Sequence, residues 1–410
     1  MLPGPSRRCG DRVNGSEPPG EFSVSGVDLA ADAVIVLGFG GPEGPEEVWP
    51  FLERVAAGRG IPRERLAAVA EHYQRFGGIS PINGHNRDLT AALTAGLRDR
   101  GIEIPVVLAH RNTPPYAADA LASLTGAGAD GDQTIVALAT SAYPSYSGCR
   151  QYREDLGQGL VDAGLSGDTR VTVRKIPPFF ALDGVSTAAT ELVLDGLDRA
   201  RAGGAANPVV LFTTHSLPSG GARASGPAAG PTDIGGEEPD AYSAAHLAVA
   251  AEVMGRTGAE APWRLVYQSR SGSPAIPWLG PDILDVIPDL RADGHDAVVV
   301  MPIGFLSDHI EVLWDLDVQA AECAAEHGLI FVRVPTVGTH PAFLDAVADL
   351  LAWHVSGGLA PAPRWATGIP APSTAWCDET CCLPGRPTQP AHPGPKSRPA
   401  VDPSRPGGRP

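Results

Sequence analysis

The chain has 410 residues, of which 43% are hydrophobic, and its formal net charge is −16 at neutral pH. Two domains of ordinary size fit within this length, and the acidic excess argues against a nucleic-acid partner, because phosphate binding needs a basic face. The sequence shows no apolar run near the ~20 residues of a membrane-spanning helix, nor the apolar segment of a secretory signal. We therefore expect a cytoplasmic protein without an integral membrane segment.

Three segments rich in Gly, Pro and Ser predict little regular structure. They are residues 1–30, an insertion at 219–238 and a tail at 384–410. Elsewhere, short runs of Val, Ile and Leu alternate with amphipathic stretches. The apolar runs predict eight strands, at 32–41, 106–109, 134–140, 169–177, 208–216, 264–270, 296–305 and 329–335. The amphipathic stretches predict helices, among them 46–57, 63–76, 87–99 and 340–354.

Unbroken apolar strands that alternate with helices are typical of an α/β fold with parallel sheets covered on both faces. The strand count suits two similar lobes of four strands each, with a boundary near residues 175–190. We expect a first lobe at 31–180, a second lobe at 181–355 whose last helix can pack back on the first, and a C-terminal extension at 356–383.

Ligands of such folds bind beyond the carboxyl ends of the strands, and His215 lies at one of these ends, in "TTHS". A strand-end histidine often does no more than bond a loop carbonyl. Glu311 and Asp315 follow a later strand at a spacing of i, i+4, so both carboxylates share one helix face. A solvated surface pair explains that spacing as well as a site does. Together, imidazole and carboxylate suit a borderline divalent ion such as Fe²⁺, and the same groups can accept protons.

Three of the six cysteines, Cys377, Cys381 and Cys382, lie within the stretch "WCDETCC". Six cysteines in a chain of this length are too few for a disulfide scaffold. In a reducing compartment the grouping favours metal or redox chemistry. A zinc site and free thiols are the open alternatives.

Six segments, in this order along residues 32–355, resemble those of ferrochelatases, and in particular the actinobacterial type within the bacterial branch that acts on coproporphyrin III. They are "LGFGGPEGPEEVWPFLERVAAGRGIPRERL", "HYQRFGGISPINGHNR", "TSAYPSYSGCRQYREDL", "TTHSLP", "YQSRSGSPAIPWLGPDI" and "PIGFLSDHIEVLWDLD". The resemblance implies two Rossmann-like lobes of the class II chelatase fold, with the porphyrin in a cleft between them.

The implied activity is insertion of Fe²⁺ into coproporphyrin III, which forms coproheme in haem biosynthesis without a nucleotide. Protoporphyrin IX as the substrate, or insertion of Co²⁺ or Ni²⁺ into a tetrapyrrole, is the enzymatic alternative. A haem carrier or an iron–sulfur sensor is the non-enzymatic one. The implied partners are the porphyrin, a donor of Fe²⁺ and a downstream coproheme decarboxylase, and the implied state is a monomer.

The resemblance also assigns residues. His215 and Glu311 match the catalytic and iron-binding pair, and Asp315 matches a second acidic step, which is not continued because Gln319 occupies the next position. The implied porphyrin contacts are Ser80, Tyr152 and Phe39.

The sequence departs from the family pattern at two porphyrin positions. Phe39 stands where some relatives carry a tyrosine that can ligate product iron, and a phenyl ring cannot ligate. Ala56 and Ala57 stand where relatives often have an arginine for a propionate, and Arg54 or Arg59 is the candidate to compensate.

The resemblance finally gives the cysteines a purpose. In the actinobacterial type, three cysteines beyond the core and one internal cysteine hold a [2Fe-2S] cluster, and the internal one matches Cys149 in "YSGCRQY". Four thiolates are the number that such a cluster needs. The implied ligands are therefore Cys149, Cys377, Cys381 and Cys382, with a structural or sensory role.

Overall fold

The computed structural model describes residues 30–58, 60–125, 131–226, 240–271, 275–369 and 381–384. The expected N-terminal arm and the Pro-rich tail fall almost entirely outside these ranges, as do Cys377 and most of the expected insertion. The part of that insertion that is described begins with a short helix, α7 (Ser219–Arg223). Among the described helices, none is both long and apolar enough to cross a membrane.

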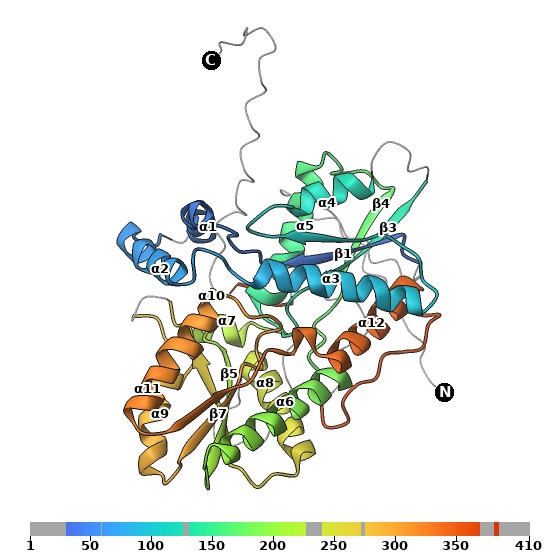
Figure 1. The fold of residues 1–410 in the computed structure, drawn as a ribbon. Coiled ribbons are helices and arrows are strands. Elements are labelled where there is room, and N and C mark those ends of the chain that lie inside the picture. The colour runs from blue at the N-terminus through green and yellow to red at the C-terminus, as the bar shows by residue number, and fades with distance from the viewer. Residues whose placement is uncertain are drawn as a thin grey trace, which may run out of the picture.

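Two four-stranded parallel sheets form the centre of the molecule (Figure 1). The first has the order β2-β1-β3-β4, and the second repeats it as β6-β5-β7-β8. Their strands are β1 (Ala33–Gly38), β2 (Val106–His110), β3 (Gln133–Ala139), β4 (Val171–Lys175), β5 (Pro208–His215), β6 (Trp263–Gln268), β7 (Ala297–Met301) and β8 (Ile330–Arg333). The predicted α/β class with two parallel sheets is confirmed.

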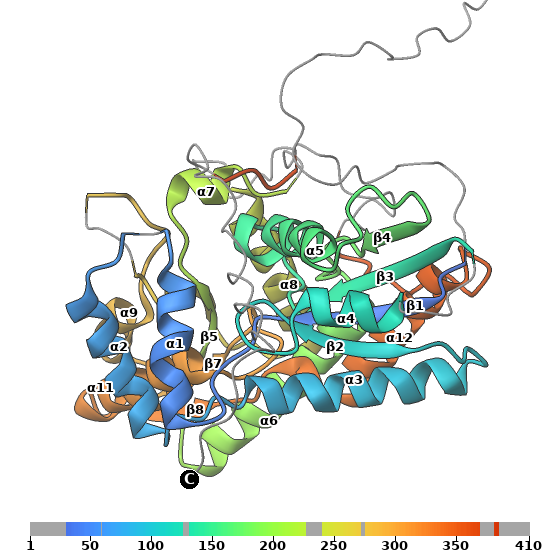
Figure 2. The same cartoon turned by 90° about the horizontal axis from the view of Figure 1, so that it is seen from above.

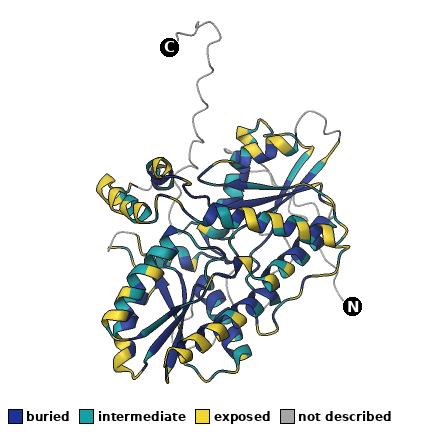
Figure 3. Cartoon of the chain, in the orientation of Figure 1, coloured by how far each residue is buried: buried dark blue, intermediate teal, exposed yellow. Residues whose placement is uncertain are grey.

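Helices cover both faces of each sheet, which is why the central strands are buried at all positions except the first residue of β3 and the last of β5 (Figure 3). The long helices are α1 (Pro45–Ala56), α2 (Arg63–Arg75), α3 (Ile82–Asp99), α4 (Ala117–Leu124), α5 (Gln151–Asp162), α6 (Asp183–Ala202), α8 (Ala241–Thr257), α9 (Ile283–Ala292) and α12 (Pro341–Val355). In β1, alternate residues face opposite layers: Val34 packs with α3, whereas Ile35 packs with α4 and α5. This is the pattern of a strand buried on both faces.

The last helix, α12, joins the two lobes. It packs against α3 of the first lobe and α6 of the second (Figure 1), and one apolar core runs through all three helices. Small residues allow the close approach: a Cβ added at Gly184 of α6 would lie 2.2 Å from the carbonyl oxygen of Ala342 in α12. Arg100, at the end of α3, adds ion pairs of 2.6 Å to Asp345 and Asp349 of α12.

Helices α1 and α2 stand apart from the first sheet and lie beside the second lobe (Figure 2). Helix α1 buries Val48, Phe51 and Leu52 in a small separate cluster, whereas α2 has no fully buried residue. The pair is therefore held by few apolar contacts, and it reaches towards the carboxyl end of the second sheet.

We predict that Gly184→Ala lowers the free energy of unfolding by about 1–3 kcal/mol, because the new methyl group meets the backbone of α12 and cannot be accommodated by a rotamer change. Urea unfolding of the purified protein measures it. Gly255→Ala is the matched control, since nothing lies within 4 Å of a Cβ at this exposed position of α8. It should raise stability by about 0.5–1 kcal/mol, and equal effects of the two changes would contradict the close packing of α6 on α12.

Candidate active site

His215 ends β5, and its imidazole is oriented by its own backbone. Nδ1 lies 2.5 Å from the carbonyl oxygen of Ser216, so this nitrogen carries a proton. Nε2 lies 3.7 Å from Oε1 of Glu311. Burial opposes a charge on the ring, but the carboxylate of Glu311 outweighs this cost and raises the pKa of His215. The structure therefore brings together the first two predicted site residues.

Glu311 lies in the short helix α10 (Ile310–Val312), which follows β7 and has His309 as its N-cap. Burial alone would raise the pKa of this carboxyl. Three imidazoles outweigh burial and hold the pKa of Glu311 below its ordinary value, namely those of His215, His309 and His72. Glu311 is thus an ionised carboxylate surrounded by histidines.

Asp315 lies four residues after Glu311, and its pKa is shifted in the opposite direction. Burial, followed by repulsion from Glu311, raises the pKa of Asp315 to about 7. Its Oδ2 accepts hydrogen bonds from the Ser269 hydroxyl and, at 3.3 Å, from Nε2 of Gln268. Ser269 has a φ of 63°, in the left-handed region that few residues other than glycine adopt, and such strain is often found at functional sites.

The helix that carries Asp315 is a π-helix, η2 (Leu313–Ala320), where an α-helix is expected from the sequence. Its hydrogen bonds close a wider turn, and this geometry is rare and frequent at functional sites. Glu311 and Asp315 still interact, so their predicted placement on one side of the helix is compatible with the wider turn.

The first lobe reaches the same site through α2. The ring of His72 stacks on Trp314 of η2 at 3.9 Å between centroids, and the Arg75 guanidinium lies 5.2 Å from the centroid of the same indole. Burial and the charge of Glu311 together raise the pKa of Tyr73. We assigned no role to His72 and Tyr73 from the sequence, although they open the segment "HYQRFGGISPINGHNR", because the resemblance of that segment was used only for Ser80.

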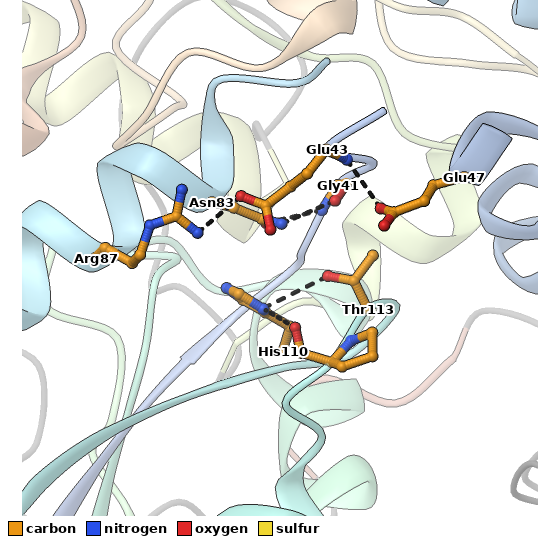
Figure 4. Close-up of polar contacts among 8 residues, drawn as sticks. Gly41, Glu43, Glu47, Asn83, Arg87, His110 and Thr113 are labelled. Carbon is orange, nitrogen blue, oxygen red and sulfur yellow. Dashed lines mark hydrogen bonds and ion pairs between the residues drawn. The ribbon is translucent and has the colours of Figure 1, made fainter. Parts of the chain in front are cut away.

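The loop after β1 carries Phe39, and Ser80, which precedes α3, lies against the same loop. Asn83 holds Gly41 by two hydrogen bonds, of 3.0 Å from the Gly41 amide and 2.8 Å to its carbonyl (Figure 4). The Ser80 amide bonds the carbonyl of Pro42 at 2.8 Å, and the ring of Phe39 packs on the small cluster of α1. Figure 4 also shows His110, at the end of β2, facing Thr113 of the following loop.

Tyr152 lies in α5 and is only 4% exposed. The guanidinium of Arg111 covers its ring, with Cζ 3.9 Å from the ring centroid, and the same Cζ lies 5.7 Å from the centroid of Phe39. An ion pair of 2.5 Å to Asp155 holds Arg111 in place. Arg111 thus lies near two predicted porphyrin residues. We did not single it out from the sequence, although it directly follows β2.

Three of the four predicted cluster cysteines lie together. Cys149 accepts a contact of 3.4 Å from Nζ of Lys175, and Sγ of Cys382 lies 3.8 Å from that of Cys381 and 3.1 Å from the Gly226 amide. Hydrogen bonds with Cys149 and then Cys381, followed by burial, raise the pKa of Cys382.

The other cysteines and the metal geometry complete this picture. None of the described cysteines forms a disulfide, and Cys323 lies apart on α11 (Ala321–Glu326) beside His327. In the described ranges, no three His, Cys, Asp or Glu side chains are arranged as they would be around a metal ion. The fourth predicted cluster residue, Cys377, lies outside those ranges.

Comparison with known proteins gives consistent matches over most of the chain. The family model described as ferrochelatase matches residues 31–355. A coproporphyrin III ferrochelatase of Leifsonia xyli subsp. xyli is 47% identical over 367 residues, which cover 86% of this chain and 91% of that protein. Proteins of the same name from Streptomyces griseus subsp. griseus and Streptomyces coelicolor are 47% and 46% identical, covering 88% and 78% of this chain and 96% and 84% of theirs.

We predict that the metal-free protein loses stability relative to Asp315→Asn as the pH rises from about 5 to about 8. The folded carboxyl has a pKa of about 7, whereas an unfolded aspartate titrates near 3.9. The folded state therefore keeps a proton that the unfolded state has lost, and its stability falls as that proton is removed, by an order of 1–2 kcal/mol after allowance for solvent screening. Urea unfolding at three pH values measures the difference. The exposed Asp289→Asn variant should follow the wild type, and parallel curves for wild type and Asp315→Asn would contradict the assignment.

Proposed function

The chain belongs to the ferrochelatase family, and we propose that it inserts Fe²⁺ into coproporphyrin III to form coproheme. The observation that carries this proposal is the contact of 3.7 Å between Nε2 of His215 and the carboxylate of Glu311, at the carboxyl end of the second sheet. The names of the three relatives reported above support coproporphyrin III as the substrate.

The chemistry of the reaction explains why such a pair is needed. A free-base porphyrin holds two N–H protons, and both must leave before four nitrogens can bind the metal. The imidazole of His215 and the carboxylate of Glu311 are bases that can take these protons, and nitrogen and oxygen donors also suit Fe²⁺ as it arrives. We assign both residues to this step.

Asp315 is suited to a secondary role, because its pKa of about 7 lets it gain or lose a proton near neutral pH. Asp315 can therefore relay a proton or an incoming ion to or from Glu311. Hydrogen bonds from Ser269 and Gln268 hold this carboxyl in place.

We propose that the porphyrin lies against the loop after β1, with Phe39 packing on the ring and Ser80 and Tyr152 supplying polar contacts. Because Arg111 covers the ring of Tyr152, we expect Tyr152 to act together with that guanidinium. Arg54, which donates to the carbonyl of Asn112, stays the candidate for a propionate. Arg59 lies outside the described residues.

We also propose a [2Fe-2S] cluster on Cys149, Cys377, Cys381 and Cys382. The contacts among Cys149, Cys381 and Cys382 support it, because four cysteine thiolates are the usual donors for this cluster. Such a cluster would supply an electron-transfer group, which metallation does not use, so its role is structural or sensory.

We further predict that the protein is a cytoplasmic monomer. It would receive Fe²⁺ from a donor and pass coproheme to a decarboxylase.

We predict that His215→Ala and Glu311→Gln each lower kcat for metallation by at least about 100-fold, because each removes a base from the site of proton transfer. The Kd for coproporphyrin III should change little, since neither residue is assigned to the propionates. Anaerobic mixing with Fe²⁺ and coproporphyrin III, followed by loss of the free-base visible bands, measures turnover. Asp315→Asn should cost about tenfold or less.

Glu322→Gln, an exposed change on α11, is the matched control and should keep wild-type turnover. Near-normal turnover in His215→Ala or Glu311→Gln would remove the assignment of the metal site. Protoporphyrin IX in place of coproporphyrin III, and Co²⁺ in place of Fe²⁺, test the substrate in the same assay. Faster turnover with either would overturn the proposed specificity.

We predict that the protein purified without oxygen holds iron and acid-labile sulfide at about two each per chain, as a [2Fe-2S] cluster requires. Each of Cys149→Ser, Cys377→Ser, Cys381→Ser and Cys382→Ser should remove the iron and the sulfide, because the cluster then lacks one of its four thiolate ligands. Cys323→Ser is the control and should keep both, because Cys323 lies apart from the group. Bound zinc without sulfide would replace the cluster by a structural zinc site.

A further inference from the structure

The imidazole of His215 is oriented by the backbone of Ser216, the residue on the far side of the peptide group that links His215 to Ser216. Its Nδ1 bonds the carbonyl of Ser216 rather than a side chain from elsewhere. The Ser216 amide donates to the carbonyl of Gln268 at 2.8 Å, which fixes one end of the peptide group. The other end, the carbonyl of His215, accepts a hydrogen bond of 3.1 Å from the phenol hydroxyl of Tyr242. This peptide group joins the Cα of His215 to the residue whose carbonyl holds Nδ1, so whatever fixes the peptide group helps to set the distance from Nε2 to Glu311.

Tyr242 comes from the first turn of α8 and is well held there. The helix begins at Asp240, whose carboxylate accepts from the amide and the hydroxyl of Ser243 at 2.9 and 2.8 Å. Tyr242 is 6% exposed, so its hydroxyl is shielded from competing water. A buried hydroxyl must find a partner within the protein, and the carbonyl of His215 is one of two.

The second partner of the phenol is Thr214, and the number of available protons determines which group donates in each hydrogen bond. His246 is buried and stacked on Tyr143 at 3.7 Å, and burial lowers its pKa to about 3, so its ring is neutral. Its Nδ1 lies 2.7 Å from the carbonyl of Tyr242 and must carry the ring proton. Nε2 then accepts the hydroxyl proton of Thr214 at 3.0 Å.

Because the proton of Thr214 is used by His246, the phenol of Tyr242 must be the donor in the 2.6 Å contact with Oγ1 of Thr214. The same proton is the one available to the carbonyl of His215. Tyr242 thus shares one proton between Thr214 and His215, and removing either acceptor gives the proton wholly to the other.

We propose that Tyr242 is a positioning residue for metallation, which holds the backbone of His215 so that Nε2 faces Glu311. The proposal rests on the proposed role of His215. It does not place Tyr242 in contact with the porphyrin or the metal.

The test uses the full chain, labelled with isotopes so that NMR detects the peptide group between His215 and Ser216. His215–Ser216 is the one His–Ser pair in the sequence, so ¹³C-carbonyl histidine with ¹⁵N-serine gives a single resonance for this peptide group. We expect Tyr242→Phe to move the carbonyl resonance to higher field as the hydrogen bond is lost. It should lower kcat about tenfold, because a displaced base is costly, with KM for the porphyrin within about twofold.

Tyr267→Phe is the matched control. Its buried phenol donates to Ser243 of the same helix end at 2.8 Å and does not bond His215. This variant should lose comparable stability but keep the carbonyl resonance and kcat of the wild type. A kcat loss in both variants without a shift of the resonance in Tyr242→Phe would reduce Tyr242 to a structural role and overturn the proposal.

The Thr214→Val variant tests the shared proton of Tyr242 independently, even if Tyr242→Phe does not fold. The phenol proton then has a single acceptor, so the carbonyl resonance should move to lower field. A resonance unchanged from the wild type would overturn the shared-proton arrangement. His215→Ala in the same assay keeps the two questions apart. If it retains turnover, the proposed role of His215 fails, whereas the resonance still reports whether Tyr242 holds the backbone.

Discussion

The packing of α12 between α3 and α6 is the constraint on which the rest of the structure depends. The candidate site draws side chains from both lobes: His72 comes from α2, whereas His215 and Glu311 follow strands of the second sheet. Contacts between such groups exist only if the sheets keep one relative orientation. A shared core gives that orientation, and the close approach at Gly184 makes it specific, because a side chain there would force the helices apart. Stability and site geometry therefore have the same origin in this fold.

Within that frame, the two acidic residues of the site are driven in opposite directions by their surroundings. Glu311 faces imidazoles and stays ionised, whereas Asp315 is buried, faces the charge of Glu311 and titrates near neutrality. Two carboxyls with separated pKa values can divide the work between a fixed negative charge and an exchangeable proton. The net charge of −16 does not by itself explain this division. It follows from the histidines beside Glu311 and the hydroxyl and amide beside Asp315.

The sequence was sufficient for the sheets and insufficient for much of the site. Each predicted strand overlaps an observed one, because a strand buried on both faces must be an apolar run. His215 and Glu311 could be found because each follows such a run, and parallel strands bring their carboxyl ends to one edge. His72, Arg111 and Tyr242 were not singled out. His72 opens a segment that resembles ferrochelatases and Arg111 follows a predicted strand, but their partners could not be named without the fold. Tyr242 lies in a segment with the pattern of an ordinary helix. The π-helix at Leu313–Ala320 was also missed, and the spacing of its residues offers no local reason for the wider turn.

The start of α8 connects features that are far apart along the chain. It carries Tyr242, whose phenol bonds the backbone of His215. It also lies against Gly226, where an added Cβ would come 3.4 Å from that of Ala241, and the amide of Gly226 donates to Sγ of Cys382. The cysteine group and His215 are therefore supported by the same helical turn. The first turn of α8 is capped by the side chain of Asp240. The support that this turn gives to both groups therefore depends on a few hydrogen bonds. The geometry of His215 is accordingly set by the helix cap as well as by the strand that carries it.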